Sequence, residues 1–166
     1  MQLTTAQLQT LKTSITTNTN PEFVAYRNAQ NNGQMANWYN VDSTFIVFKP
    51  TEPTFNIGDV ISYVAVANLT TANLDRLNTF YNLNPDNFEP DRADQRTYLA
   101  DTFSGALGGA GQATRDALDA LYRRPAQRGE QLYCTGTGTT VTPGALNVTA
   151  NGDITTDNIT DALALP

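Results

Sequence analysis

The apolar residues near the N-terminus recur at helical spacing. Leu8, Leu11 and Ile15 lie on one face of a helix in the segment TTAQLQTLKTSITTN. Thr4 or Thr5 stands where an N-cap is needed, because a threonine hydroxyl accepts a hydrogen bond from a free backbone N–H of the first turn. The pattern therefore predicts an amphipathic first helix.

Similar patterns predict further helices along the chain. In NPEFVAYRNAQ, Asn20 is a favoured N-cap and Pro21 stands at the first helical position, where proline is preferred. The segment IGDVISYVAVANL (57–69) is rich in β-branched residues but also fits a helical face, so helix is favoured there. The remaining predicted helices cover residues 34–40, 70–83 (capped by Thr70 or Thr71), 92–107, 114–124 and 155–165 (capped by Thr155 or Thr156).

Other segments interrupt the helical pattern. STFIVFK (43–49) is rich in β-branched and aromatic residues and runs to a proline, so a short strand is predicted there. The run GGAGQ (108–112) is expected to break a helix, and Pro125 either to kink a helix or to start the next one. After Cys134 the chain is rich in Gly, Thr and Asn, which predicts a loop or β-ribbon that forms an extended arm over about 135–152.

These elements define the expected fold class. The chain is predicted to be mainly α, a small helical domain with a minor β-strand or β-ribbon element and a Thr/Gly-rich arm. A length of 166 residues is typical of one structural domain, residues 1–166, with a single hydrophobic core.

The composition narrows the choice of partners. Charged residues make up only 16% of the chain, and uncharged polar residues, among them 25 Thr and 17 Asn, replace them. Acidic residues outnumber basic ones, and the net charge is −6. This balance opposes binding to phosphate backbones, which needs Lys and Arg to displace counterions, but it suits a surface that DNA passes without sticking.

Several kinds of chemistry lack the residues they require. The chain has no histidine, which removes the commonest general base and the commonest zinc ligand. Cys134 is the single cysteine, so no intrachain disulfide and no paired-cysteine metal site can form. No window has the length of apolar sequence that spans a membrane, and no signal peptide is recognised, so we expect a protein that stays in the cytoplasm or in a particle assembled there.

Other candidate sites have two interpretations each. TGTGTT resembles a nucleotide loop but lacks the lysine and the spacing of a P-loop, so an arm or a turn is favoured. The pairs Asp91 with Asp94 and Asp153 with Asp157 could serve acid–base chemistry or calcium, although capping and solvation explain them better. The aromatic residues Trp38, Tyr39, Phe45 and Phe48 suit a packed core better than a platform for a sugar or a base.

The positive charge is concentrated at Arg115, Arg123, Arg124 and Arg128. On consecutive helical turns, several of these side chains could share one side. They could pair locally with the neighbouring carboxylates Asp116, Asp119 and Glu130, as solvated helix faces do. They could equally grip carboxylates or carbonyls of a neighbouring subunit, because a guanidinium group is planar and offers several donors.

The order of features along the chain resembles small virion-gene proteins of tailed bacteriophages and prophages. The features in order are LTTAQLQTLKTSI, a tryptophan, a strand-like middle, YLADTFSG, RRPAQRGEQLYCTGTGT and NGDITTDNITDAL. The resemblance covers most of the length of the chain. Arg128 and Glu130 match an R-x-E-x-L pattern typical of the group. Gln127 and Gly129 depart from it, since Thr and a longer side chain are expected there.

The resemblance implies a structural protein of the virion, with no enzymatic activity, catalytic residue, cofactor or metal. We expect a head–tail connector, or adaptor, whose subunits form a homo-oligomeric ring below the portal and contact portal and neck or tail proteins. A tail-completion, tail-tube or capsid-decoration protein is the alternative within the class. A small carboxylate-dependent hydrolase or nucleotide-binding enzyme, and a soluble host-takeover factor, are alternatives outside it. The expected interface residues are Arg115, Arg123, Arg124, Arg128, Glu130, Thr135, Thr137, Thr139 and Val141.

Overall fold

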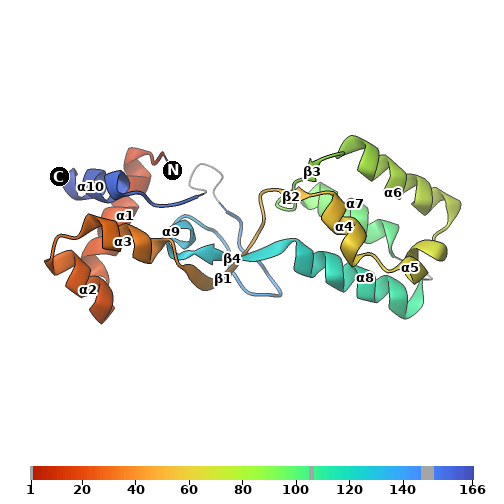
Figure 1. Ribbon diagram of the computed structural model, residues 1–166, viewed down its shortest axis with the longest axis horizontal. Coiled ribbons are helices and arrows are strands. Elements are labelled where there is room, and N and C mark those ends of the chain that lie inside the picture. The colour runs from red at the N-terminus through yellow and green to blue at the C-terminus, as the bar shows by residue number, and fades with distance from the viewer. Residues whose placement is uncertain (1, 105–106, 147–151) are drawn as a thin grey trace. The chain divides into compact units, whose positions relative to one another are not determined.

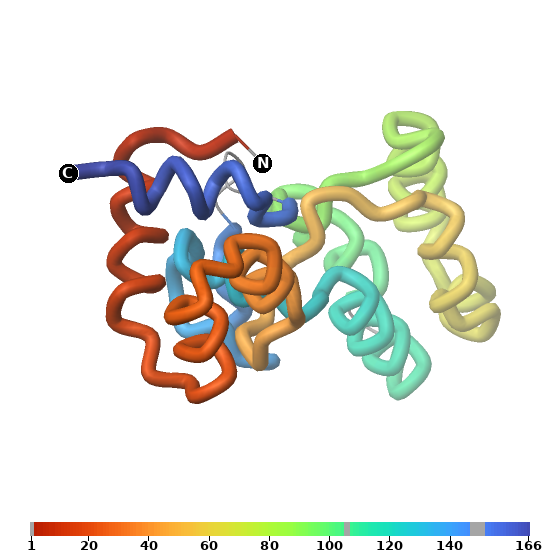
Figure 2. The backbone as a smooth tube through the Cα atoms, turned by 60° about the vertical axis from the view of Figure 1, so that its left-hand side comes forward, coloured from red at the N-terminus to blue at the C-terminus, as the bar shows by residue number. Residues whose placement is uncertain are grey.

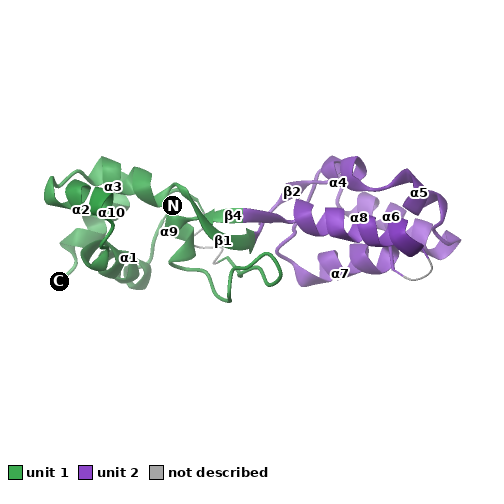
Figure 3. Cartoon of the chain, turned by 90° about the horizontal axis from the view of Figure 1, so that it is seen from below, with its two compact units in different colours: residues 1–47, 125–166 green, residues 48–124 purple. Residues whose placement is uncertain are grey.

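The chain folds into two compact units. The computed structural model describes residues 2–104, 107–146 and 152–166. Unit 1 is Met1–Val47 with Pro125–Pro166, and unit 2 is Phe48–Arg124 (Figure 3). The mainly helical fold class is confirmed, but the expectation of a single core is wrong, because each unit has a hydrophobic cluster of its own. That the chain is one structural domain stays a prediction.

Unit 1 combines the two ends of the chain. The predicted caps of its helices are confirmed, because Thr4 accepts from the Gln7 backbone N–H at 3.3 Å and Asn20 from that of Glu22 at 3.0 Å. Thr155 caps the last helix in the same way. Its elements are α1 (Thr5–Thr17), α2 (Pro21–Asn28), α3 (Asn32–Tyr39), β1 (Asp42–Phe48), β4 (Arg123–Gln127), α9 (Arg128–Gln131) and α10 (Thr156–Ala164), with β1 and β4 crossing into unit 2.

The core of unit 1 joins these two ends. Helix α10 lies against α1 and α3, and Figures 1 and 2 both show the first and last helices side by side. Ile159 of α10 and Leu11 of α1 are both fully buried. The rings of Phe23, Trp38 and Tyr39 meet edge to face, with centroids 4.8 to 5.4 Å apart. Such ring pairs add to the stabilisation that burial provides.

Unit 2 is one continuous segment of chain. Helices α4 and α5 pack against α8, and α6 packs against α7. The predicted helix over 57–69 is two helices, because the extended backbone of Ile61 interrupts it and Ser62 caps the second. The elements are β2 (Glu52–Pro53), α4 (Phe55–Val60), α5 (Tyr63–Ala67), α6 (Thr71–Leu83), β3 (Asn87–Phe88), α7 (Ala93–Thr102) and α8 (Gly108–Leu121).

The glycine run GGAGQ begins α8 and does not follow a helix. The helix predicted over 92–107 ends as α7 at Thr102, and two of its expected residues, 105–106, lie outside the described residues. A side chain at Gly111 would place its Cβ 2.6 Å from the Cβ of Leu107. Glycine is therefore needed there for a close approach, and tertiary packing outweighs its low helix propensity.

Pro125 lies in a strand, so both helical expectations for it are wrong. Strand β4 pairs with β1, and the Arg128 N–H donates to the Val41 carbonyl at 3.0 Å beyond one end of the pair. At the other end the Lys49 N–H donates to the Tyr122 carbonyl at 2.8 Å. A proline disfavours helical backbone in the residue before it and is tolerated in an edge strand, which explains this outcome.

The described part of the expected arm, residues 135–146, is folded back on unit 1. The Ile46 N–H donates to the Gly138 carbonyl at 2.7 Å, and the Gly144 N–H donates to the Ile46 carbonyl at 2.8 Å. Thr135 and Ala145 exchange two further backbone hydrogen bonds. This segment is not extended, because the edge of β1 satisfies its backbone groups. Residues 147–151, also assigned to the arm, lie outside the described residues.

Candidate interaction site

One glycine of TGTGTT, Gly138, makes room for an aromatic ring of unit 1. A Cβ added to Gly138 or to Gly144 would overlap the ring of Phe45 in β1. Gly136 and Gly138 also have positive φ angles of 91° and 62°, which side-chain-bearing residues rarely adopt. Packing and backbone conformation therefore account for the glycines that resemble a nucleotide loop.

Threonine hydroxyls hold the same segment together. The Thr142 N–H donates to the Thr139 hydroxyl at 3.0 Å, and the Thr137 hydroxyl donates to the Thr142 carbonyl at 3.1 Å. Val141 lies within this bonded turn and is 84% exposed. Two of the expected interface threonines, Thr137 and Thr139, thus support the loop that presents an apolar side chain to solvent, while the backbone of Thr135 pairs with Ala145.

The four arginines, several of which could have shared one side of a helix, lie on three different elements. Arg115 is in α8, where it donates to the Phe103 carbonyl, and Arg123 is in β4, where it forms an ion pair with Asp119 at 3.3 Å. Arg124 also belongs to β4, and Arg128 begins α9 in unit 1. The proposed sharing of one side is wrong because the helix assumed to carry the cluster ends at Leu121.

The side chain of Glu130 is buried in unit 1 and accepts hydrogen bonds from the backbone there. Its side chain is almost fully enclosed in unit 1. The carboxylate accepts from the Gln127 N–H at 2.9 Å and from the Gly152 N–H at 3.3 Å. These bonds join α9 to the segment before α10, since a buried carboxylate must be hydrogen-bonded. Glu130 therefore does not qualify as an interface residue.

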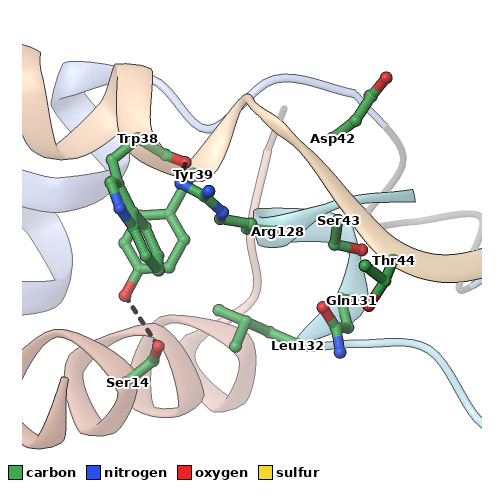
Figure 4. Close-up of a pocket in the computed structure, with 9 residues that line it drawn as sticks. All are labelled: Ser14, Trp38, Tyr39, Asp42, Ser43, Thr44, Arg128, Gln131 and Leu132. Atoms are coloured by element: carbon green, nitrogen blue, oxygen red, sulfur yellow. Dashed lines mark hydrogen bonds between the residues drawn. The ribbon is translucent and has the colours of Figure 1, made fainter. Parts of the chain in front are cut away.

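Arg128 and Trp38 form the candidate site. The Arg128 guanidinium lies over the Trp38 ring, 4.3 Å from its centroid, and Nη1 donates to the Trp38 carbonyl at 3.3 Å. An arginine over an indole is a favourable cation–π pair, and this contact restricts the motion of the guanidinium. The pair borders an open pocket of about 630 Å³ in unit 1 (Figure 4). Its lining residues are Ser14, Trp38, Tyr39, Asp42, Ser43, Thr44, Arg128, Gln131 and Leu132.

The pocket wall is largely uncharged. The hydroxyls of Ser14 and Tyr39 are hydrogen-bonded at 2.7 Å, and burial raises the pKa of Tyr39 to about 12. Tyr39 is therefore neutral at physiological pH. Asp42 also lines the pocket, but Figure 4 shows its carboxylate directed away from Arg128. The positive charge of Arg128 dominates the part of the pocket next to Trp38.

Arg128 belongs to the bases that donate to carbonyls and not to carboxylates, as Arg27 and Arg96 do. Lys49, Arg76, Arg92 and Arg123 all form ion pairs with carboxylates. Among the described residues Arg128 has no carboxylate within ion-pair distance, and the hydrogen bond of its guanidinium goes to the Trp38 carbonyl. A half-buried guanidinium with unused donors is suited to binding a carboxylate from outside the chain.

One member of each candidate acidic pair is engaged by another side chain. Asp94 pairs with Arg92 at 2.6 Å, which lowers the pKa of its carboxyl group, and Asp153 accepts from the Gln127 amide at 2.8 Å. Within the described ranges, no group of three His, Cys, Asp or Glu residues could hold a metal ion. In the same ranges, no helix has the length and apolar character needed to cross a membrane.

Comparison with models of protein families, with curated proteins and with solved structures finds no match in any of the three. Sequence reasoning named Arg128 as an interface candidate and Trp38 as a core residue but did not connect them. They are 90 positions apart, and no local pattern signals such a contact. The turn after α3 and the start of α9 bring them together.

Proposed function

We propose that this chain is a non-enzymatic structural protein of a tailed bacteriophage particle, and within that class a head–tail connector subunit. The observation that carries the proposal is the exposure of large apolar side chains on both units. Large apolar side chains at the surface mark a binding site where they gather into a patch, and they offer area that a partner can cover. The residues are Val41, Val141 and Leu163 in unit 1 and Phe55, Tyr63, Val64, Leu74 and Leu83 in unit 2.

Two different surfaces per subunit suit a ring. A closed ring with head-to-tail contacts requires each subunit to present two unlike, complementary surfaces. Val141 on the threonine-bonded loop is 84% exposed in unit 1, and Tyr63 at the start of α5 is 89% exposed in unit 2. Such side chains are suited to contacts with neighbouring copies or with portal and neck proteins.

The negative net charge of the chain supports the expectation that DNA passes the subunit without binding to it. A net charge of −6 repels a phosphate backbone, and most of the bases are already engaged with carboxylates or carbonyls. DNA could pass such a subunit without adhering. We therefore expect the purified chain to bind duplex DNA poorly at low salt in an electrophoretic or fluorescence assay, and tight binding would count against the connector role.

The decisive experiment is immunogold electron microscopy of purified particles with an antibody against this chain. Label confined to the head–tail junction is the expected result. Label over the capsid or along the tail would replace the connector with a decoration or tube protein. Particles without label would contradict a virion role and favour an enzyme or a host-directed factor. An antibody against the major capsid protein of the same particles provides the matched control.

A further inference from the structure

Unit 2 carries a structured acidic turn, which we define as residues 84–94. Its sequence, NPDNFEPDRAD, holds four carboxylates and one arginine, and all five of these side chains are exposed. Phe88 is buried and anchors the turn, and β3 pairs with β2 in the register Glu52 with Phe88. The Thr54 N–H donates to the Asp86 carbonyl at 2.9 Å. The backbone of the turn is thereby held in place, although its side chains face solvent.

Two carboxylates of the acidic turn have no ion-pair partner among the residues that the structure describes. Arg92 pairs with Glu89 at 3.2 Å and with Asp94 at 2.6 Å. Asp86 and Asp91 form no ion pair with any residue that the structure describes. The charge of Asp91 acts on the nearby Arg96, whereas no such interaction is seen for Asp86 within the described ranges. The turn therefore presents carboxylates without an ion-pair partner on an ordered backbone, which lowers the entropy lost when they bind a cation.

Unit 1 carries a positive charge at Arg128, opposite in sign to the acidic turn. Arg128 lies over the Trp38 ring at the edge of the pocket, and the hydrogen bond from its guanidinium to the Trp38 carbonyl uses one of its five N–H groups. The ring contact and the carbonyl hydrogen bond restrict the guanidinium, so it can receive both oxygens of a carboxylate with less further ordering. Gln131 lines the same pocket, and its side-chain amide offers further donors.

We propose that the Arg128 pocket of one copy binds the acidic turn of a second copy through the carboxylate of Asp86 or Asp91. The proposal rests on the ring proposed above and assigns one of its contacts. Charge complementarity carries it, because an unpaired cation lies in unit 1 and unpaired carboxylates lie on an ordered turn of unit 2. Since each copy has one of each, the contact repeats head to tail, as a ring requires.

The test uses two full-length variants that remove opposite sides of the contact. Arg128→Glu replaces the positive charge of the pocket with a negative one. The double substitution Asp86→Lys with Asp91→Lys replaces two negative charges of the acidic turn with positive ones. We expect self-association, measured by sedimentation and native mass spectrometry, to weaken roughly 30-fold or more in each variant, as for loss of one partner of a desolvated charge pair. Mixing the two variants should restore dimers, because the turn of the first and the pocket of the second are both unaltered.

The sole tryptophan supplies a direct readout. Trp38 lies beneath Arg128, so its fluorescence should change with protein concentration in the wild-type chain and in the mixture, but not in either variant alone. The matched control is Asp59→Lys with Asp75→Lys, which makes the same charge change at two other exposed positions of unit 2. This control should associate like the wild-type chain.

Three results would overturn the proposal: a wild-type chain that stays monomeric at the highest attainable concentration, variants that associate like the wild-type chain, or a mixture that stays monomeric. Restored association in the mixture would show that both variants are folded, because a variant that fails to fold has no intact surface to contribute. Failure here is distinct from failure of the proposed function. Label at the head–tail junction together with any of these results would retain the connector and place another partner on the Arg128 pocket.

Discussion

The two units differ in how their cores are assembled. Unit 2 is built from one continuous segment, Phe48–Arg124, whereas unit 1 needs residues from both ends of the chain. Asn40 exchanges two hydrogen bonds with the backbone of Ile154, 114 positions away. Long-range closure of this kind costs more chain entropy than local packing. The comparison teaches that the stability of unit 1 depends on α10, while unit 2 contains all of its own core.

The largest effect is expected from Ile159→Asp in α10. Ile159 is fully buried in the core of unit 1, and an unpaired carboxylate there should destabilise unit 1 by about 4 kcal/mol or more. Hydrogen exchange measured by mass spectrometry should show loss of protection in α1, α3 and α10, with unit 2 still protected. Thr160→Asp, on the exposed face of the same helix, is the control. Equal loss in both units would contradict the comparison.

The reciprocal change is Leu118→Ala in α8. Leu118 is 1% exposed in the core of unit 2, and truncation of a buried leucine costs about 2 to 5 kcal/mol. Protection of α4, α6 and α8 should fall, while Trp38 fluorescence reports an intact unit 1. Leu74→Ala, at a position that is 40% exposed, should change the free energy of unfolding much less. A shift in Trp38 emission with Leu118→Ala would show that the cores are not separate.

A smaller effect is expected from Gly138→Val. Valine would overlap the Phe45 ring and would adopt a positive φ of 62°, which together should cost about 1 to 3 kcal/mol. The measurement is thermal unfolding followed by Trp38 fluorescence. Gly33→Val in α3, where an added Cβ would meet only the Asn31 Oδ1 at 3.7 Å, is the matched control in unit 1. An unchanged midpoint for Gly138→Val would refute the packing role of this glycine.

The smallest effect at neutral pH is expected from Tyr39→Phe, which removes the hydrogen bond to Ser14 and should cost about 1 kcal/mol. Burial raises the pKa of Tyr39 to about 12, above the ordinary value near 10. The unfolded chain loses this proton first, so unit 1 should lose stability as pH rises from about 10 to 12.

The alkaline loss attributable to Tyr39 should be absent in Tyr39→Phe. Urea unfolding at successive pH values, followed by Trp38 fluorescence, measures it. Tyr63→Phe, at a position that is 89% exposed, serves as control. The interpretation fails if the two variants and the wild-type chain share one pH profile.

Errors of sequence interpretation occurred where tertiary contacts decide. The glycine run before Gln112 suggested a break, yet α8 starts there because Gly111 packs closely on Leu107. Pro125 suggested a helix, yet β1 offers β4 a partner strand. The interface role assigned to Glu130 rested on local spacing, and the structure buries its carboxylate beneath the segment that carries Gly152.

The sequence by itself determined the local structure of this protein. Caps such as Thr4, Asn20 and Thr155, together with apolar spacing, specify helices because those interactions lie within one turn. Only the tertiary structure decided that there are two cores and that the ring of Phe45 needs a glycine opposite it. It also decided that Arg128 lies over Trp38 and forms no ion pair with a carboxylate of the described residues. These contacts join residues far apart in the chain, where no periodic pattern records which side chains will meet.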